Sequence, residues 1–480
     1  MTDGLAYGTR EGRWVIGAAV LGSGVAFLDG TVVNAALPAI AEDLHAGLAS
    51  LQWTLTAYLL TLGSLLVVGG SLGDLYGRRR MFVAGLVGFA IASLGCAVAQ
   101  TTALLIVARC VQGAAAAALV PGSLALISAS FRVEDRGRAI GAWSGLAGIS
   151  TAIGPFIGGW LIDSVSWRFV FLINLPLSAV AIVVTLRHVP ESRDEASARH
   201  VDVAGGITLS VGLAGIVYAL IEGPAGASGT MVAIAVGFGL GGLALFAAVE
   251  ARSPQPMVPL ELFRSRQFSG ANAVTVAVYA ALGVATFLIV VHLQTDLGYS
   301  ALSAGAALLP VTAIMLALSA RAGALAQRIG PRWPMTVGPV IVGAGLVLLS
   351  QVDRGSSYAT GVFPGVLVFG LGLALTVAPL TAAVLAAVDD HHAGVGSAIN
   401  NASARIASLL AIAVLPAAAG LSDDFVAGYR KTLLISAGLA AAGGLIAFLT
   451  IRDGAAVQPM VNVPGGPSCH EPGVKIDQAA

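Results

Sequence analysis

The sequence contains fourteen long apolar stretches joined by short connections. A bilayer core about 30 Å thick is crossed by about 20 mostly apolar residues in a helix that rises about 1.5 Å per residue. The stretches do not alternate between apolar and polar residues, so they predict helices rather than the strands of a barrel. They run approximately over residues 14–38, 51–73, 81–99, 103–127, 139–162, 169–186, 203–221, 230–249, 268–291, 301–320, 334–350, 361–387, 396–418 and 431–451.

Charged residues are scarce, which excludes an ordinary soluble domain. Only 10% of the 480 residues are charged and 57% are hydrophobic, whereas about a quarter of the residues of a soluble domain are charged. Three cysteines, two of them within apolar stretches, cannot build a disulfide framework. We therefore predict an all-α integral membrane protein.

The basic residues predict the orientation of these helices, because Lys and Arg are enriched in cytoplasmic loops. With the N-terminus inside, 19 of the 25 basic residues fall in inside segments and four in outside segments. The other two, Arg109 and Arg405, lie within spans. This distribution predicts fourteen helices in the plasma (inner) membrane, with both termini cytoplasmic.

Two halves of the chain share a pattern. Residues 70–79 and 323–332 carry similar residues at the same spacing, 253 residues apart, and Pro121 and Pro379 repeat with an offset of 258. Chance matching in a chain with 61 glycines is the alternative. Internal repeats around a central site are typical of secondary transporters that work by alternating access.

The repeat predicts a division into four parts. A six-helix unit is used twice, with two further helices between the copies. The tail is rich in Pro and Gly and has no amphipathic pattern, which predicts disorder. The predicted parts are an N-terminal six-helix bundle (1–200), two inserted helices and a linker (201–260), a C-terminal six-helix bundle (261–452) and a disordered cytoplasmic tail (453–480).

Four motifs occur in order along the first half, in the first predicted helix, in the loop after the second, in the fourth and in the fifth. They are LDGTVVNAALP at 28–38, GSLGDLYGRRR at 70–80, RCVQG at 109–113 and GPFIGG at 154–159. With these motifs the chain resembles the major facilitator superfamily from position 28 to about 421, and within it the fourteen-helix drug:proton antiporter-2 family. The resemblance implies the major facilitator fold and transport driven by a proton gradient.

Asp29 and Arg109 are charges within predicted spans. A carboxylate deep in a bilayer is costly and usually functional. Burial favours the neutral form of a carboxyl group and a nearby cation favours its charged form, so one proton can switch it. The depths of the two residues differ by about 5 Å at about 1.5 Å per residue. We predict that Asp29 accepts the coupling proton and that Arg109 modulates its affinity; the alternatives are a static ion pair and an Asp29 that faces water.

The loop after the second stretch has a fixed pattern of glycines and charges. The resemblance implies that this loop latches the cytoplasmic ends of the two bundles, with Glu134 or Asp135 as counter-charges for its arginines. In the second copy Gln327 replaces the acid, so we expect no charged latch there. The alternative is that the arginines only anchor the topology. The predicted gate consists of Gly70, Asp74, Gly77, Arg78 and Arg79.

The fifth stretch carries the motif that marks exchangers in this family. Small residues at four-residue spacing allow close helix contact, and Pro155 removes a backbone hydrogen bond and bends the helix. Simple helix packing is the alternative for the glycines. The predicted antiporter motif consists of Gly154, Pro155, Gly158 and Gly159.

Polar and aromatic side chains away from helix ends are candidates for a substrate cavity. Arg405 is the most informative because an intramembrane guanidinium needs a partner or water. The tenth stretch contains no acid, which favours neutral, amphipathic or anionic substrates. Interhelical hydrogen bonding is the alternative for most of the others. The candidates are Trp53, Gln112, Trp143, Asn174, Asn272, Tyr279, Asn400, Asn401 and Arg405.

These patterns predict a secondary transporter that exports hydrophobic or amphipathic small molecules by proton antiport, and not an enzyme. The alternative is a proton symporter or facilitator for uptake of a small organic solute. We expect no cofactor and no metal site, since the proton gradient supplies the energy and no P-loop occurs. The expected partners are a small hydrophobic substrate and the lipid bilayer, without nucleic acid, and the chain is expected to function as a monomer.

Overall fold

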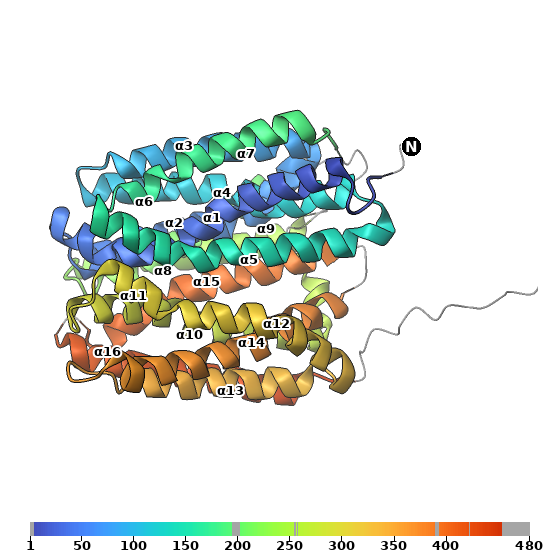
Figure 1. Cartoon of the computed structure of the whole chain (residues 1–480). Helices are drawn as coiled ribbons and strands as arrows, with labels where there is room; N and C mark the ends of the chain where they lie inside the picture. Colours follow the sequence, from blue (N-terminus) through green and yellow to red (C-terminus); the bar gives the residue numbers. More distant parts are fainter. Residues whose placement is uncertain are drawn as a thin grey trace, which may run out of the picture.

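A computed structural model describes residues 4–193, 202–253, 256, 258–388, 393–421 and 423–453. These residues form a bundle of long, roughly parallel helices (Figure 1). The helices of the first half are α1 (Arg10–Asp43), α2 (Leu48–Tyr76), α3 (Arg78–Ala97), α4 (Thr102–Ser130), α5 (Val133–Ser164), α6 (Phe169–Leu172) and α7 (Asn174–His188). Two further helices follow, α8 (Val203–Glu222) and α9 (Gly229–Arg252).

The second half begins with a short 3₁₀ helix, η1 (Leu260–Arg264), and contains a π-helical turn, η2 (Tyr358–Val362), before α14. Its α-helices are α10 (Arg266–Thr295), α11 (Ala301–Ala307), α12 (Leu309–Ile329), α13 (Arg332–Leu349), α14 (Phe363–Ala386), α15 (Ala393–Ala418) and α16 (Phe425–Thr450).

Each of the fourteen predicted stretches coincides with one helix or with two consecutive helices. The sixth is divided into α6 and α7, and the tenth into α11 and α12. Among the described residues, thirteen helices are long and apolar enough to cross a membrane. α5 is not among them, although it has 32 residues. The all-α prediction is therefore confirmed, whereas the count of fourteen spans stays a prediction.

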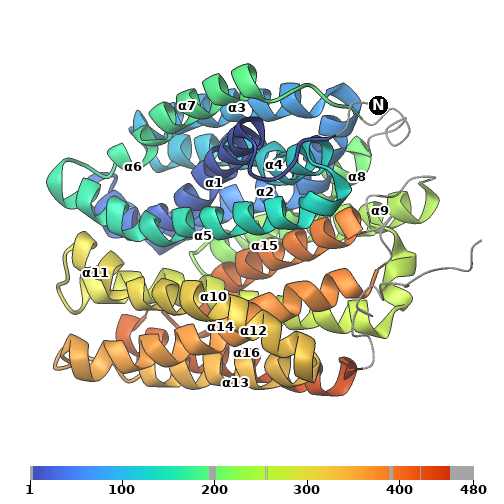
Figure 2. The same cartoon turned by 45° about the vertical axis from the view of Figure 1, so that its right-hand side comes forward.

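The helices pack as two groups with an extra pair beside them (Figures 1 and 2). In the first group α1 packs on α5, and α4 on α2 and α3; in the second, α13 packs on α14 and α16, and α10 on α15 and α16. The groups meet mainly where α2 lies against α15 and α5 against α11. α8 and α9 pack on each other, and α8 also contacts α2 and α15. The predicted boundaries at 200 and 260 fall at or near residues outside the described ranges and stay predictions.

The repeated loops have the same local structure in both halves. Gly77 between α2 and α3 has φ +109°, and Gly330 between α12 and α13 has φ +85°, a region that glycine enters at no steric cost. In each half a carboxylate accepts a hydrogen bond from a first-turn amide of the next helix, Glu191 at 3.0 Å for α3 and Asp453 at 3.3 Å for α13. An acceptor at this position satisfies an amide that has no partner within its helix.

We call the end at which α1 begins the N side and the opposite end the far side (Figure 1). Successive long helices run in alternate directions, so α1, α5 and α15 begin on the N side, whereas α2, α4 and α14 end there. The predicted tail beyond residue 453 lies outside the described residues.

Candidate functional site

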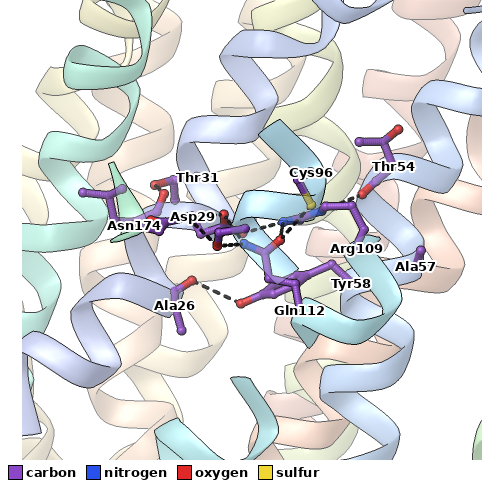
Figure 3. Close-up of polar contacts among 12 residues, drawn as sticks. Ala26, Asp29, Thr31, Thr54, Ala57, Tyr58, Cys96, Arg109, Gln112 and Asn174 are labelled. Carbon is purple, nitrogen blue, oxygen red and sulfur yellow. Dashed lines mark hydrogen bonds and ion pairs between the residues drawn. The ribbon is translucent and has the colours of Figure 1, made fainter. Parts of the chain in front are cut away.

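A buried ion pair joins α1 to α4 in the first half (Figure 3). Nη1 of Arg109 lies 2.5 Å from Oδ2 of Asp29. The side chains are 1% and 0% exposed, respectively. The depth estimate from the sequence thus placed these two charges within reach of each other, and the structure shows them in direct contact.

Other buried side chains complete the surroundings of Asp29. Gln112 and Asn174 donate from their side-chain amides to Oδ1 of Asp29 at 2.9 and 3.0 Å. Gln112 is one turn after Arg109 on α4, and three residues along a helix place two side chains on one face. Asn174 begins α7 directly after the break from α6. Ser93 of α3 accepts from both amides at 2.8 and 3.3 Å. Side chains from α1, α3, α4 and α7 therefore meet around this carboxylate.

The guanidinium of Arg109 is held on several sides. Its Nε donates to the carbonyl of Thr54 at 3.0 Å, and its Nη1 also donates to Oε1 of Gln112 at 2.6 Å. The ring of Tyr58 lies 4.3 Å below the guanidinium carbon, which is a cation–π geometry. A buried ion pair persists when its remaining donors and acceptors are satisfied in this way.

One buried acceptor beside this pair has no partner. In the described part of the chain, Oδ1 of Asn174 accepts no hydrogen bond, although its amide nitrogen contacts Asp29. An unsatisfied buried acceptor costs about 1–3 kcal/mol. We call Asp29, Arg109, Gln112 and Asn174 the carboxylate cluster.

The structure places four of the predicted cavity residues away from the cavity described below. Gln112 and Asn174 are fully buried in the carboxylate cluster and do not line the cavity described below. The indole nitrogen of Trp53 donates to Glu222 of α8 at 2.8 Å, and that of Trp143 donates to Ser23 of α1 at 2.8 Å. These four side chains thus make helix-to-helix hydrogen bonds, which was the alternative interpretation.

A cavity lies between α10, α14 and α15 in the N-side half of the second group. Its volume is about 110 Å³. Four predicted residues line it, and one of them, Asn400, also donates to Asn272 and Thr275 of α10 at 3.2 and 2.6 Å. Tyr279, Asn401 and Arg405 are the other three. The full lining is Tyr279, Thr381, Val384, Leu385, Ser397, Asn400, Asn401, Ala404 and Arg405.

The two groups of helices are tied together on the far side. Oδ1 and Oδ2 of Asp163, at the far end of α5, accept hydrogen bonds from the amides of Ala301 and Leu302 at 3.1 and 2.9 Å. Gln294 of α10 donates to the carbonyl of Ala35 at 3.1 Å. A third bond joins α2 to α15 in the same half of the molecule. The far side is closed, and the cavity lies toward the N side.

The predicted antiporter motif lies within this closure. A Cβ on Gly159 would overlap the backbone of Ala301 and Leu302 of α11, and one on Gly305 would overlap the carbonyl of Pro155. Gly154 and Gly158 face α1, where a Cβ would overlap side chains of that helix. Small residues therefore let α5 approach both α1 and α11 closely. The role of the motif in exchange stays a prediction.

The predicted gate loop has a different counter-charge from the one expected. Nε of Arg78 contacts Oδ1 of Asp74 at 2.7 Å. Arg79 lies 3.9 Å from Glu191, which follows α7, rather than pairing with Glu134 or Asp135. The sequence reasoning missed Glu191 because the loop that returns it to α3 cannot be inferred from spacing. The gate partners described here all belong to the first half, in agreement with an N side that is not closed by this loop.

Removing the charge of Asp163 is expected to open the far side. A hydrogen bond to a charged group contributes about 1.5–3 kcal/mol, so Asp163→Asn should raise the population of far-side-open molecules about tenfold. The measurement is the labelling rate of a cysteine placed at Ala35, 1% exposed, by a maleimide that cannot cross membranes. Asp353→Asn is the matched control, because among the described residues Asp353 accepts hydrogen bonds only within its own loop. Equal labelling rates in the wild-type background, in Asp163→Asn and in Asp353→Asn would contradict the closure role of Asp163.

Comparison with known proteins identifies the family. A family model described as Major Facilitator Superfamily matches residues 19–412. Multidrug resistance protein Stp of Mycobacterium tuberculosis (strain CDC 1551 / Oshkosh) is 37% identical over 397 residues, covering 82% of this chain and 73% of Stp. The methylenomycin A resistance protein of Streptomyces coelicolor is 34% identical over 445 residues, covering 91% and 92% of the two chains.

A solved structure has the same fold. The crystal structure of a bacterial homologue of the human lysosomal transporter Spinster has a TM-score of 0.65 at 14% identity and covers 92% of this chain and 97% of that one. The match in sequence, the thirteen apolar helices and the shared fold lead to one conclusion. The chain is a multi-pass integral membrane protein that belongs to the major facilitator superfamily.

Proposed function

We propose that the protein exports hydrophobic or amphipathic small molecules in exchange for protons. The names of its relatives include multidrug and methylenomycin A resistance proteins, which supports small toxic compounds as substrates. Proton antiport is typical of this family. The family and these relatives are transporters, and we propose no enzymatic reaction and no cofactor for this chain.

The carboxylate cluster is the observation that carries the proposal. Burying the charged carboxylate of Asp29 in a membrane costs free energy unless the group is paired or protonated. When a proton binds Asp29, the ion pair with Arg109 loses its charge attraction, and Arg109 keeps its contacts with Thr54, Gln112 and the ring of Tyr58. The unpartnered Oδ1 of Asn174 provides an acceptor for the new O–H group. Protonation thus changes the contacts between α1, α4 and α7.

Alternating access follows from the two ends of the molecule. We assign the N side to the cytoplasm, as the distribution of basic residues predicts. The closed far side and the cavity toward the N side then describe a state that receives substrate from the cytoplasm. In the opposite state the contacts of Asp163 break, and we propose that the loop with Asp74 latches the N side. The chain contains both halves of this path and is proposed to work as a monomer without nucleic acid.

Resistance and vesicle transport test the function together. Cells that express the protein are tested for growth in tetracenomycin C, methylenomycin A, puromycin and lincomycin, the compounds named for its relatives. For the compound with the largest gain in resistance, inside-out vesicles with an acidic interior should accumulate it. Accumulation only with an alkaline interior, or none that depends on the proton gradient, would favour the uptake or facilitator alternative.

A further inference from the structure

Arg405 is a partly buried cation that the carboxylate cluster does not use. It lies on α15, twelve residues after the first residue of that helix, and its side chain lines the N-side cavity. Within the described ranges, no hydrogen bond or ion pair is formed by its guanidinium. Arg109, the other arginine within the spans, is fully paired by contrast.

The described residues of the three helices that line the cavity offer Arg405 no negative charge. The helices that form the cavity, α10, α14 and α15, contain no Asp or Glu along their whole length. A guanidinium stays protonated under all physiological conditions, so it cannot lower its cost by losing its proton. It therefore needs water or an anionic ligand at this depth.

Two other polar side chains of the cavity are already engaged. The side-chain amide of Asn401 donates to the carbonyl of Ser397 and the hydroxyl of Thr381 donates to the carbonyl of Val377, each within its own helix. Val384, Leu385 and Ala404 contribute an apolar wall. The cavity thus combines one unpaired cationic group and several neutral polar side chains with an apolar wall, which is the complement of an amphipathic anion.

The position of Arg405 also fits a substrate site at the boundary between the two halves. A Cβ on Gly63 of α2 would lie 3.3 Å from the Cβ of Arg405. α2 belongs to the first group of helices and α15 to the second, and the substrate sites of such transporters lie where the two repeats meet. A ligand bound to Arg405 therefore lies where its contacts change when one group of helices moves against the other.

We propose that Arg405 binds the anionic group of an amphipathic organic acid, a carboxylate or phenolate with an attached apolar ring system. This inference rests on the proposed function, because it takes the N-side cavity as the place where exported molecules bind. Charged guanidinium-to-carboxylate hydrogen bonds are short and can be bidentate. The apolar wall contacts the ring system. The acid group therefore decides whether an acid or a neutral compound is preferred, and the ring system contributes affinity.

Two probes that share one aromatic body test the charge requirement. 1-Naphthoate and its neutral methyl ester are titrated into the full-length protein in nanodiscs of phosphatidylcholine, and binding is read from naphthyl fluorescence. Since a hydrogen bond to a charged group contributes about 1.5–3 kcal/mol, Arg405→Gln should weaken naphthoate binding about tenfold or more. Ester binding should stay unchanged, which also shows that the variant is folded, and Arg405→Lys should retain part of the affinity.

Arg321→Gln is the matched control. Arg321 lies on α12 outside the cavity, is exposed, and donates to the carbonyl of Ala317 in its own helix, so its loss should leave both probes unaffected. Equal weakening of acid and ester in Arg405→Gln, or naphthoate binding that is unchanged, would overturn the proposal. The proposal would also be overturned if naphthoate bound neither in phosphatidylcholine discs nor in discs with added phosphatidylglycerol. Arg405 would then hold a lipid phosphate instead of an organic acid.

The binding test and the transport test can fail separately. Binding to nanodiscs needs no proton gradient, so selective naphthoate binding through Arg405 stands even if vesicles show no proton-driven accumulation. Conversely, proton-driven accumulation of a resistance compound together with Arg405-independent naphthoate binding would remove the anion site and leave the proposed exporter intact.

Discussion

Replacing Asp29 by Asn should abolish proton-driven accumulation while leaving passive exchange of substrate measurable. Asn keeps the shape of the carboxyl group and one of its two acceptor oxygens but cannot bind a proton. We expect accumulation in inside-out vesicles with an acidic interior to fall by about tenfold or more, since each 1.4 kcal/mol of lost coupling free energy corresponds to a factor of ten. Counterflow of labelled against unlabelled compound, without a gradient, measures the exchange that remains.

The same helix provides a matched control for this change. Asp43, at the far end of α1, contacts Arg168 at 2.6 Å, but its side chain is 45% exposed. Asp43→Asn therefore removes an equally short Asp–Arg contact from α1 without touching the membrane interior. It should retain gradient-driven accumulation. Full accumulation by Asp29→Asn, or an equal loss in both variants, would mean that Asp29 does not carry the coupling proton.

Removing Arg109 alone should destabilise the protein more than removing both members of its pair. Breaking a buried ion pair costs about 3–5 kcal/mol, because the remaining charge is left buried without its partner. In Arg109→Gln the carboxylate of Asp29 keeps only Gln112 and Asn174 as donors. The double variant Asp29→Asn, Arg109→Gln should regain much of the lost thermal stability, but it should not regain proton-driven accumulation.

Thermal unfolding in detergent measures this double-mutant cycle. The same cycle on Asp43 and Arg168 is the control, because exposed ion pairs contribute about 0–1 kcal/mol, so its coupling free energy should be small. Additive destabilisation by the two changes in the buried pair would contradict the interdependence of Asp29 and Arg109. Recovery of proton-driven transport by the double variant would show that the pair is only structural.

The positions of the helices could be predicted because bilayer thickness limits both their length and their composition. All fourteen predicted stretches coincide with helices, although the breaks between α6 and α7 and between α11 and α12 were not foreseen. Those breaks depend on tertiary contacts rather than on local hydropathy. The break after α6 has a consequence for the site, because it places Asn174 at the start of α7, beside Asp29.

Only the charged residues of the candidate site could be predicted with a specific role. A charged residue in an apolar stretch is rare, so Asp29, Arg109 and Arg405 stood out. The polar residues that contact them did not, because Ser93 and Thr54 resemble many other hydroxyl residues in helices, and Thr54 contributes only its backbone carbonyl. Hydropathy gives depth but not rotation about the helix axis, so Gln112 was assigned to the cavity although it faces the carboxylate cluster.

The contact between Asp163 and α11 could not be predicted from the sequence either. Asp163 lies at a predicted helix end, where an acid is ordinary, and its partners are backbone amides that have no residue-type signature. Such contacts depend on how the two halves meet. The sequence repeat predicts that the halves exist but does not determine which of their surfaces are in contact in a given state.

Infrared difference spectroscopy of the protonation of Asp29 tests the central claim most directly. Spectra of the wild-type protein in lipid are recorded as the pH is lowered, with and without a compound to which the protein confers resistance. We predict a carbonyl band of a buried, protonated carboxyl group that is absent in Asp29→Asn, present in Asp43→Asn, and reduced when the compound binds. A band that persists in Asp29→Asn, or one that does not respond to the compound, would contradict proton exchange at Asp29.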